Sequence, residues 1–422
     1  MSSDVIRTVD ISRERVRIDD LAPRIARPAL WAGAAGLAAS VLLGLAGAES
    51  FFRAYLVNYG FFLALTLGAL FFVLIHHATR ASWSVAVRRI AEHFTGTLPM
   101  LAALSLVFLV PMVLGAPAAI HALYPWTDAA HVAGDPFLRQ KTAYLNVPFF
   151  VIRLMVYFSV WCGLAQWFYT MSLRQDQSGE GALTLQMQKI APPALIAYAL
   201  TVTFAAVDLL MSLAPHWYST IFGVYFFSGC ALAFYCTLAI TMYLLQGAGR
   251  LTGAITVEHY HDVGKFAFGF VVFWAYIAYS QYMLMWYANL PEETAWYHVR
   301  QQPPWLWFSL LLLFGHFMAS FLVLISRLPK RRPPVLVAGA AWVLAMCWFD
   351  VFWLVLPHAE QNGVHGPPVA AKLHALDVLQ CLTTLLGVGG LYVWRVVSRM
   401  GRTALLPQRD PRLEDSLAFE NY

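Results

Sequence analysis

The chain has 422 residues, of which 59% are hydrophobic and only 12% are charged. A soluble domain carries about 25% charged residues, so this composition excludes a soluble globular protein and predicts an all-α protein that crosses a membrane several times. The formal net charge of +5 is explained by basic loops beside the membrane, and we therefore exclude nucleic acid as a partner.

Apolar runs of roughly twenty residues, the length that crosses a bilayer as a helix, recur along the chain. A polar N-terminal arm, residues 1–27, precedes them, and a polar tail, residues 398–422, follows them. The ten expected spans are 28–48, 55–75, 98–123, 147–171, 191–213, 219–245, 264–287, 305–326, 334–356 and 375–397. Most arginines and lysines fall in the two tails and in alternate loops, which predicts that both termini are cytoplasmic.

Two segments of the chain repeat one pattern, in which a diproline precedes an aspartate and a Pro-His pair. The first copy consists of Pro192-Pro193, Asp208 and Pro215-His216, and the second of Pro333-Pro334, Asp350 and Pro357-His358. The repeat predicts two four-helix bundles in parallel orientation, 55–218 and 219–358, flanked by single helices within 28–54 and 359–397. A carboxylate at lipid depth costs roughly 2.5 to 3.5 kcal/mol, so both aspartates indicate polar sites inside the protein.

The first copy predicts a proton path. Asp208, Ser212 and His216 fall at i, i+4 and i+8 of the expected helix and share one of its faces. Carboxylates and histidines in series carry protons across membranes, although a structural aspartate paired with Arg153 is an equal alternative. The further proton-path candidates are Asp350, His358, His316, His261, Asp262 and Lys265.

Cofactor chemistry has little support in the residues themselves. The five cysteines lie inside expected spans without a CxxC motif, which excludes an iron–sulfur cluster held by this chain alone. Mid-span His316 has no partner for a haem, and we find no metal-ligand motif. A quinone would need an apolar slot with polar groups at one end, and the candidate contacts are Asp208, His216, Arg153, Gln281 and Tyr282.

A longer motif surrounds the first aspartate. The sequence from Asp208 to Tyr225, with Ser212, Pro215-His216-Trp217 and Phe222-Gly223, resembles the D-x-x-M-S-L-x-P-H-W-[FY]-S-T-[IM]-[FY]-G segment of NrfD-like quinol-interacting membrane proteins. Within that family it is most similar to the two related membrane subunits of bacterial alternative complex III. Segments 144–150, 261–265 and 274–293 resemble the same family, and segment 410–421 is similar to the tail of the smaller of these two subunits.

The resemblance implies an integral subunit of a quinol:cytochrome c oxidoreductase in the bacterial inner membrane, without a complete catalytic cycle of its own. In that family, quinol or menaquinol is oxidised near the outer face, and the electrons pass to iron–sulfur clusters and c haems on partner subunits. The implied partners are an NrfD-like paralogous membrane subunit, an iron–sulfur subunit, multihaem cytochrome c subunits, small membrane subunits and lipid. This chain would supply support, a proton path and a surface for quinone contact, and would bind no cofactor alone.

Two points remain open at the level of sequence. A proton-coupled secondary transporter is the alternative function, because repeats and buried carboxylates also suit transport. The second copy of the pattern has Leu354 where the first has Ser212, so we expect chemistry at Asp208 more than at Asp350.

Overall fold

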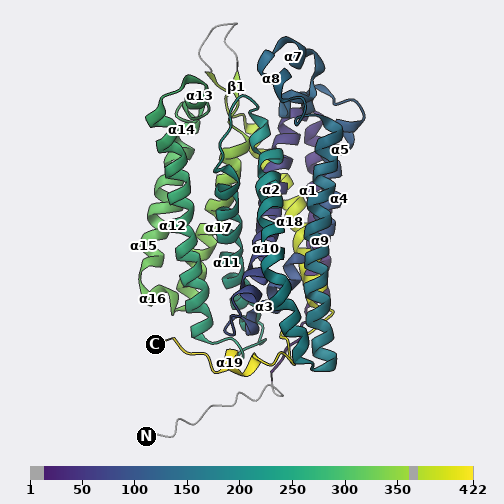
Figure 1. The fold of residues 1–422 in the computed structure, drawn as a ribbon, viewed down its shortest axis with the longest axis vertical. Coiled ribbons are helices and arrows are strands. Elements are labelled where there is room, and N and C mark those ends of the chain that lie inside the picture. The colour runs from purple at the N-terminus through teal and green to yellow at the C-terminus, as the bar shows by residue number, and fades with distance from the viewer. Residues whose placement is uncertain (1–13, 361–368, 422) are drawn as a thin grey trace.

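The computed structural model describes residues 14–360 and 369–421, which form a bundle of long helices (Figure 1). The first 13 residues of the expected N-terminal arm and residues 361–368 of the last outer loop lie outside this description. Ten helical segments of the described chain are long and apolar enough to cross a membrane, which confirms an all-α, multi-pass membrane protein. They are α1 Ala22–Gly44, α2 Ala48–Ala78, α3 to α5 within Val85–Val113, α9 Val147–Ser178, α10 Gly181–Leu209, α11 Phe222–Gly247, α12 Val257–Ala288, α14 and α15 within Trp305–Ile325, α17 Pro333–Val355 and α18 Ala375–Met400.

Short elements connect the spans at the two ends of the bundle. They are α6 Ala118–Leu123, η2 Pro125–Thr127, α7 Ala129–Gly134, α8 Pro136–Lys141, η3 Met211–Leu213, α13 Pro291–Arg300, α16 Arg327–Lys330, α19 Leu413–Leu417 and the antiparallel strands β1 Ala359–Glu360 and β2 Val369–Ala370. We call the end with α7, α8, α13 and the strands the loop end. The opposite end, which holds Glu14 and Asn421, is the tail end (Figure 1).

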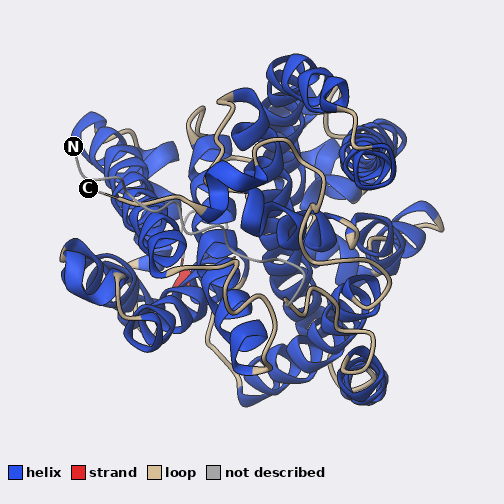
Figure 2. Cartoon of the chain, turned by 90° about the horizontal axis from the view of Figure 1, so that it is seen from below, coloured by secondary structure: helices blue, strands red, loops and turns tan. Residues whose placement is uncertain are grey.

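Helices α2 and α11 lie at the centre of the bundle and are the most buried spans. They pack against each other, and between them they contact α10, α12, α17 and α18, so the remaining spans form a ring around them (Figure 2). The outward faces of that ring carry exposed apolar side chains such as Leu42, Ile196 and Leu284, as a helix facing lipid requires. The division into bundles 55–218 and 219–358 stays a prediction, in which α2 and α11 are the equivalent first helices.

The expected third span, 98–123, is wrong in its bounds. The span begins at Val85 and ends at Val113, and α6 is a separate short helix. Arg88 and Arg89 were expected in a loop because they are basic, but in α3 Val85–Thr95 they pair with Glu92 and with Asp410 and Asp176 inside the protein. After Val113 the chain leaves the helix, and Gly115 and Ala116 have positive φ angles of 117° and 42°, which a helix does not allow.

The C-terminal tail lies across the tail end of the bundle and covers α3. Asp410 Oδ2 accepts a hydrogen bond from Arg88 Nη2 at 2.7 Å, and Asp410 also pairs with Arg412. The hydroxyl of Ser416 donates to the carbonyl of Trp83 at 2.7 Å and accepts from the backbone N–H of Ala86 at 3.0 Å. The tail is therefore part of the packed structure and supplies counter-ions for α3.

The first and last spans, α1 and α18, form the tightest helix pair, because glycines let their backbones approach. A Cβ added at Gly36 would lie 2.5 Å from the backbone nitrogen of Gly387, and one at Gly390 would lie 2.5 Å from that of Gly33. Neither backbone can yield without separating the two helices. The flanking pair therefore depends on these four glycines.

Gly36→Ala is expected to lower the stability of the protein by about 1–3 kcal/mol through overpacking against α18. Thermal denaturation in a mild detergent measures this loss. Gly163→Ala on α9 is the matched control, since its new methyl group would meet no atom within 4 Å. Equal melting temperatures for the two variants would contradict the glycine-dependent contact.

Candidate functional site

Asp208, the last residue but one of α10, is fully buried and held by α9. Its carboxylate accepts from Arg153 Nε at 2.8 Å, from Arg153 Nη2 at 2.9 Å and from the hydroxyl of Tyr157 at 2.8 Å. Arg153 also donates to the carbonyl of Tyr144 at 2.9 Å and stacks on its ring. This bidentate pair corresponds to the structural alternative for Asp208, in which a guanidinium fixes the carboxylate in place.

The expected helical face through Asp208, Ser212 and His216 does not exist. Helix α10 ends at Leu209, and the chain continues through the 3-10 turn η3 Met211–Leu213. Ser212 Oγ donates to the backbone carbonyl of Asp208 at 2.5 Å and so closes this turn without reaching the carboxylate. His216 follows in the next turn with 55% of its side chain exposed. The spacing of eight residues assumed a continuous helix, and the tight turn redirects the last half of that segment.

His216 is bound by the loop that carries α8 rather than by Asp208. Its Nε2 lies 2.5 Å from Asp135 Oδ2, and its ring stacks on Phe137. Asp135 caps α8 by accepting from the backbone N–H groups of Phe137 and Leu138. Burial alone would raise the pKa of Asp135, but the N–H of Leu138 and the contact with His216 outweigh it and hold that pKa below its usual value. His216 therefore faces a stable anion at the loop end.

Asp350 of α17 is also buried, but its partners are neutral. The hydroxyl of Tyr225 donates to Oδ1, and Trp274 Nε1 donates to Oδ2 at 3.1 Å. Within residues 14–360 and 369–421, no arginine or lysine forms an ion pair with Asp350, whereas Asp208 has Arg153. The two repeated aspartates thus differ in their partners, a guanidinium for Asp208 and two neutral donors for Asp350, and the expectation of chemistry at Asp208 stays a prediction.

His316 lies beside this second aspartate at a break in the eighth span. Residues Leu312–Ala319 form a π-helical segment, and the carbonyl of Gly315 accepts from Ser320 and from Trp342 instead of continuing the α-helical ladder. The ring of His316 stacks on Trp274 at a centroid distance of 4.0 Å. Its Nδ1 is buried without a hydrogen-bond partner among the described residues. Such π segments occur frequently at functional sites, and this one joins His316 to Asp350 through Trp274.

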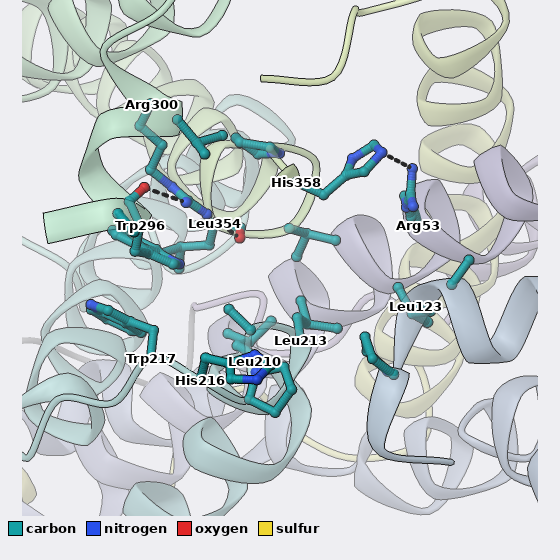
Figure 3. Close-up of a pocket in the computed structure, with 18 of the residues that line it drawn as sticks. Arg53, Leu123, Leu210, Leu213, His216, Trp217, Trp296, Arg300, Leu354 and His358 are labelled. Atoms are coloured by element: carbon teal, nitrogen blue, oxygen red, sulfur yellow. Dashed lines mark hydrogen bonds between the residues drawn. The ribbon is translucent and has the colours of Figure 1, made fainter. Parts of the chain in front are cut away.

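Both Pro-His pairs line a single cavity of about 490 Å³ at the loop end (Figure 3). The Nδ1 of His358 donates to the carbonyl of Leu356. The other ring nitrogen, Nε2, is therefore the acceptor of a hydrogen bond from Arg53 Nη1 at 3.0 Å. His216 lies on another wall, and Arg300 of α13 lines the same space. The Pro-His pairs of both copies of the repeat therefore line one cavity, although the sequence indicated two separate polar sites.

Sequence reasoning missed several residues of these sites. Tyr225 and Trp274 belong to the segments that resemble the NrfD-like family, and that resemblance was the available signal for them. Arg53 and Arg300 carried no signal, because loop arginines are common. Their positions become informative only when the fold brings both to the cavity.

The five candidate quinone contacts do not converge on one pocket. Asp208 and Arg153 satisfy each other. Gln281 accepts from Ser219 at 2.8 Å and donates to the hydroxyl of Tyr297 at 3.0 Å. Tyr282 accepts from Gln301, and His216 lines the loop-end cavity. These side chains therefore lie in separate hydrogen-bonded groups, and the set of quinone contacts stays a prediction.

The remaining candidates lie apart from the others, in the first turns of α12 at the tail end. Asp262 forms an ion pair with Lys265, and Lys265 donates to Asn421 of the tail at 2.8 Å. His261 is buried beside them with its Nδ1 unpaired among the described residues. These three residues therefore form a separate polar cluster at the tail end of the bundle.

No protein-family model matches the sequence, and no curated protein matches it. Within residues 14–360 and 369–421, no cluster of three or more His, Cys, Asp or Glu side chains could hold a metal ion. The functional argument therefore depends on the geometry and on the motif around Asp208.

Proposed function

We propose that this chain is an integral, non-haem subunit of a quinol-oxidising electron-transfer complex of the alternative complex III type. In this proposal the bacterial inner membrane is its location, and both termini lie in the cytoplasm with the tail end. Its partners are an NrfD-like paralogous subunit, an iron–sulfur subunit and multihaem cytochrome c subunits. Iron–sulfur clusters and c haems belong to those partners.

The observation that carries the proposal is how the residues of the motif from Asp208 to Tyr225 are used. Trp217 stacks on Trp296 at 4.3 Å, Ser219 binds Gln281, and Tyr225 binds Asp350. Asp208 anchors the start of the motif to Arg153. The Trp217–Trp296 stack joins the two expected bundles, and the other three contacts each lie within one bundle. A motif whose residues make several long-range contacts supports a shared architecture more strongly than sequence similarity alone.

Within the complex, we assign different work to the two aspartates. Asp208 supports the loop end through its ion pair. Asp350, with Tyr225 and Trp274 as neutral donors and His316 behind Trp274, is the group that takes up and releases a proton. Because the five candidate quinone contacts are dispersed, we place quinol oxidation on the paralogous subunit and derive no step through quinone here.

Asp350→Asn is expected to lower proton movement per quinol oxidised by about tenfold or more, because an amide cannot carry a proton between partners. The amide has the same shape and still accepts from Tyr225 or Trp274, so the complex should assemble. The measurement is acidification by the purified complex in proteoliposomes, with Asp377→Asn at the start of α18 as a control away from this cluster. Full proton movement by an assembled Asp350→Asn complex would reduce Asp350 to a structural role.

Purification from native membranes tests the assignment to a complex. A tagged chain is expected to co-isolate with a multihaem cytochrome and an iron–sulfur subunit, with the absorption of c haem and with quinol:cytochrome c activity. A stable lone protein without haem absorption would overturn the proposal.

One observation favours the transporter as a second candidate. The π-helical break around His316, at mid-span beside a buried carboxylate, is typical of discontinuous helices at transport sites. Against it, the cavity shared by both Pro-His pairs lies at the loop end rather than at mid-span. Substrate uptake by the lone protein in vesicles would favour transport, and co-isolation with the haem subunits would exclude it as the main function.

A further inference from the structure

Arg300 is a buried cation on the wall of the loop-end cavity. It is the last residue of α13 and only 3% exposed. Its guanidinium stacks on Trp296 at 3.4 Å and donates to three backbone carbonyls, those of Trp296, Trp353 and Leu354, at 3.1, 3.3 and 3.0 Å. A guanidinium has five N–H groups, so one remains on each terminal nitrogen.

Arg300 differs from the other buried arginines in having no counter-ion. Each of the others forms an ion pair with a carboxylate, and they are Arg88, Arg89, Arg153 and Arg250. No carboxylate among the side chains that the structure describes forms an ion pair with Arg300, and burial lowers its pKa to about 9. A buried charge without a partner is costly, so a site of this kind calls for an anion from outside the chain.

The cavity beside Arg300 has the size and lining of a small-molecule site. Its volume of about 490 Å³ lies within the range of ligand pockets, and Leu213, Leu354 and Trp217 provide apolar walls (Figure 3). Arg53 adds a second cation on another wall.

Two acidic residues also line the cavity, but both are placed at helix N-termini. Asp128 caps α7 by accepting from the backbone N–H of Ala130, and exposed Glu292 lies in the first turn of α13. Positive helix ends stabilise both carboxylates. Neither acid pairs with Arg300, so the buried positive charge on the wall stays uncompensated.

We propose that this cavity binds a small molecule that carries an oxyanion, with the carboxylate or phosphate on Arg300 and the apolar part against Leu213 and Leu354. The two N–H groups of Arg300 that the backbone leaves free match the two oxygens of such a group. A soluble organic acid and the head group of an anionic phospholipid both present this chemistry. The site does not depend on the proposed function, because Arg300 and the cavity belong to this chain alone.

Binding by the purified full-length chain tests the proposal. With the chain in detergent at constant ionic strength, citrate, succinate and inorganic phosphate are the soluble probes, and isothermal titration calorimetry is the readout. We expect saturable binding of at least one probe, weakened about tenfold or more by Arg300→Gln. Arg300→Lys retains the charge and should bind more tightly than Arg300→Gln. Arg139→Gln, at an exposed position of α8 outside the cavity, should leave binding unchanged.

A second variant and a measurement with anionic lipid complete the test. Because Arg300 also binds the ends of α13 and α17, Arg53→Gln provides a weakened site without touching those carbonyls. In nanodiscs, thermal stabilisation by phosphatidylglycerol over phosphatidylcholine that is lost in both variants would identify a lipid head group as the source. Absence of binding in both arms, or equal binding by wild type, Arg300→Gln and Arg53→Gln, would overturn the proposal.

Discussion

Asp208→Asn is expected to destabilise the protein by about 3–5 kcal/mol, because it leaves the guanidinium of Arg153 buried without its counter-ion. Asp208 is fully buried, and the Arg153 side chain is only 8% exposed, so water cannot replace the lost carboxylate oxygens. The amide also leaves a single oxygen for the three donors that the carboxylate serves, Nε and Nη2 of Arg153 and the hydroxyl of Tyr157. The measurement is thermal denaturation in detergent, followed by the yield of folded protein from membranes.

A double variant separates this pair from a catalytic role. Arg153→Met with Asp208→Leu removes both charges and fills similar volume, and such replacements of buried ion pairs are often neutral or stabilising. We therefore expect the double variant to recover most of the stability that Asp208→Asn loses. Asp350→Asn is the matched single control, because its partners Tyr225 and Trp274 are neutral and lose no counter-ion. If Asp208→Asn proves no less stable than Asp350→Asn, the ion pair is not what holds the loop end.

The ten spans could be predicted because a membrane imposes one strong rule, about twenty apolar residues in a row. The same rule failed where a span contains paired charges. The charged segment with Arg88, Arg89 and Glu92 was expected to be a loop. Asp410 pairs with Arg88 and Asp176 with Arg89, and both aspartates come from segments far along the chain. A hydropathy score sums the contribution of each residue independently, whereas the free energy of burying a charged side chain depends on the partner that it contacts.

The site could be predicted only in part for a related reason. The repeat correctly selected both aspartates as buried, and it suggested that they were equivalent. What distinguishes them is Arg153, which lies 55 residues from Asp208 and has no counterpart beside Asp350. A helical face drawn through Asp208 and His216 failed because the tight turn after Leu209 is set by the Ser212 hydroxyl, whose partner is a backbone carbonyl. Contacts of this kind leave no periodic signal in the sequence.

Asp410→Asn is expected to lower stability by about 3–5 kcal/mol and to release the tail from α3. Asp410 and Arg88 are both essentially unexposed, and their contact of 2.7 Å joins positions 322 residues apart. Losing the carboxylate leaves Arg88 with Glu92 alone, at 3.3 Å. Limited proteolysis of the tail together with thermal denaturation measures both effects. Asp415→Asn, on the exposed side of the same tail, is the control and should change stability by less than about 0.5 kcal/mol.

The same pair predicts how stability depends on pH. Burial alone would raise the pKa of Asp410, but Arg88 and then Arg412 outweigh it and hold that pKa below its ordinary value of 3.8. A carboxyl group whose pKa is lower in the folded state stabilises the protein fully above the ordinary value, and this contribution disappears as the pH falls through the lowered pKa. The tail of the wild-type protein should therefore stay protected from protease between about pH 5 and 7 and become accessible below about pH 4. In Asp410→Asn the tail should be accessible across the whole range, and a wild-type tail that loosens between pH 5 and 7 would show that a group other than Asp410 holds it.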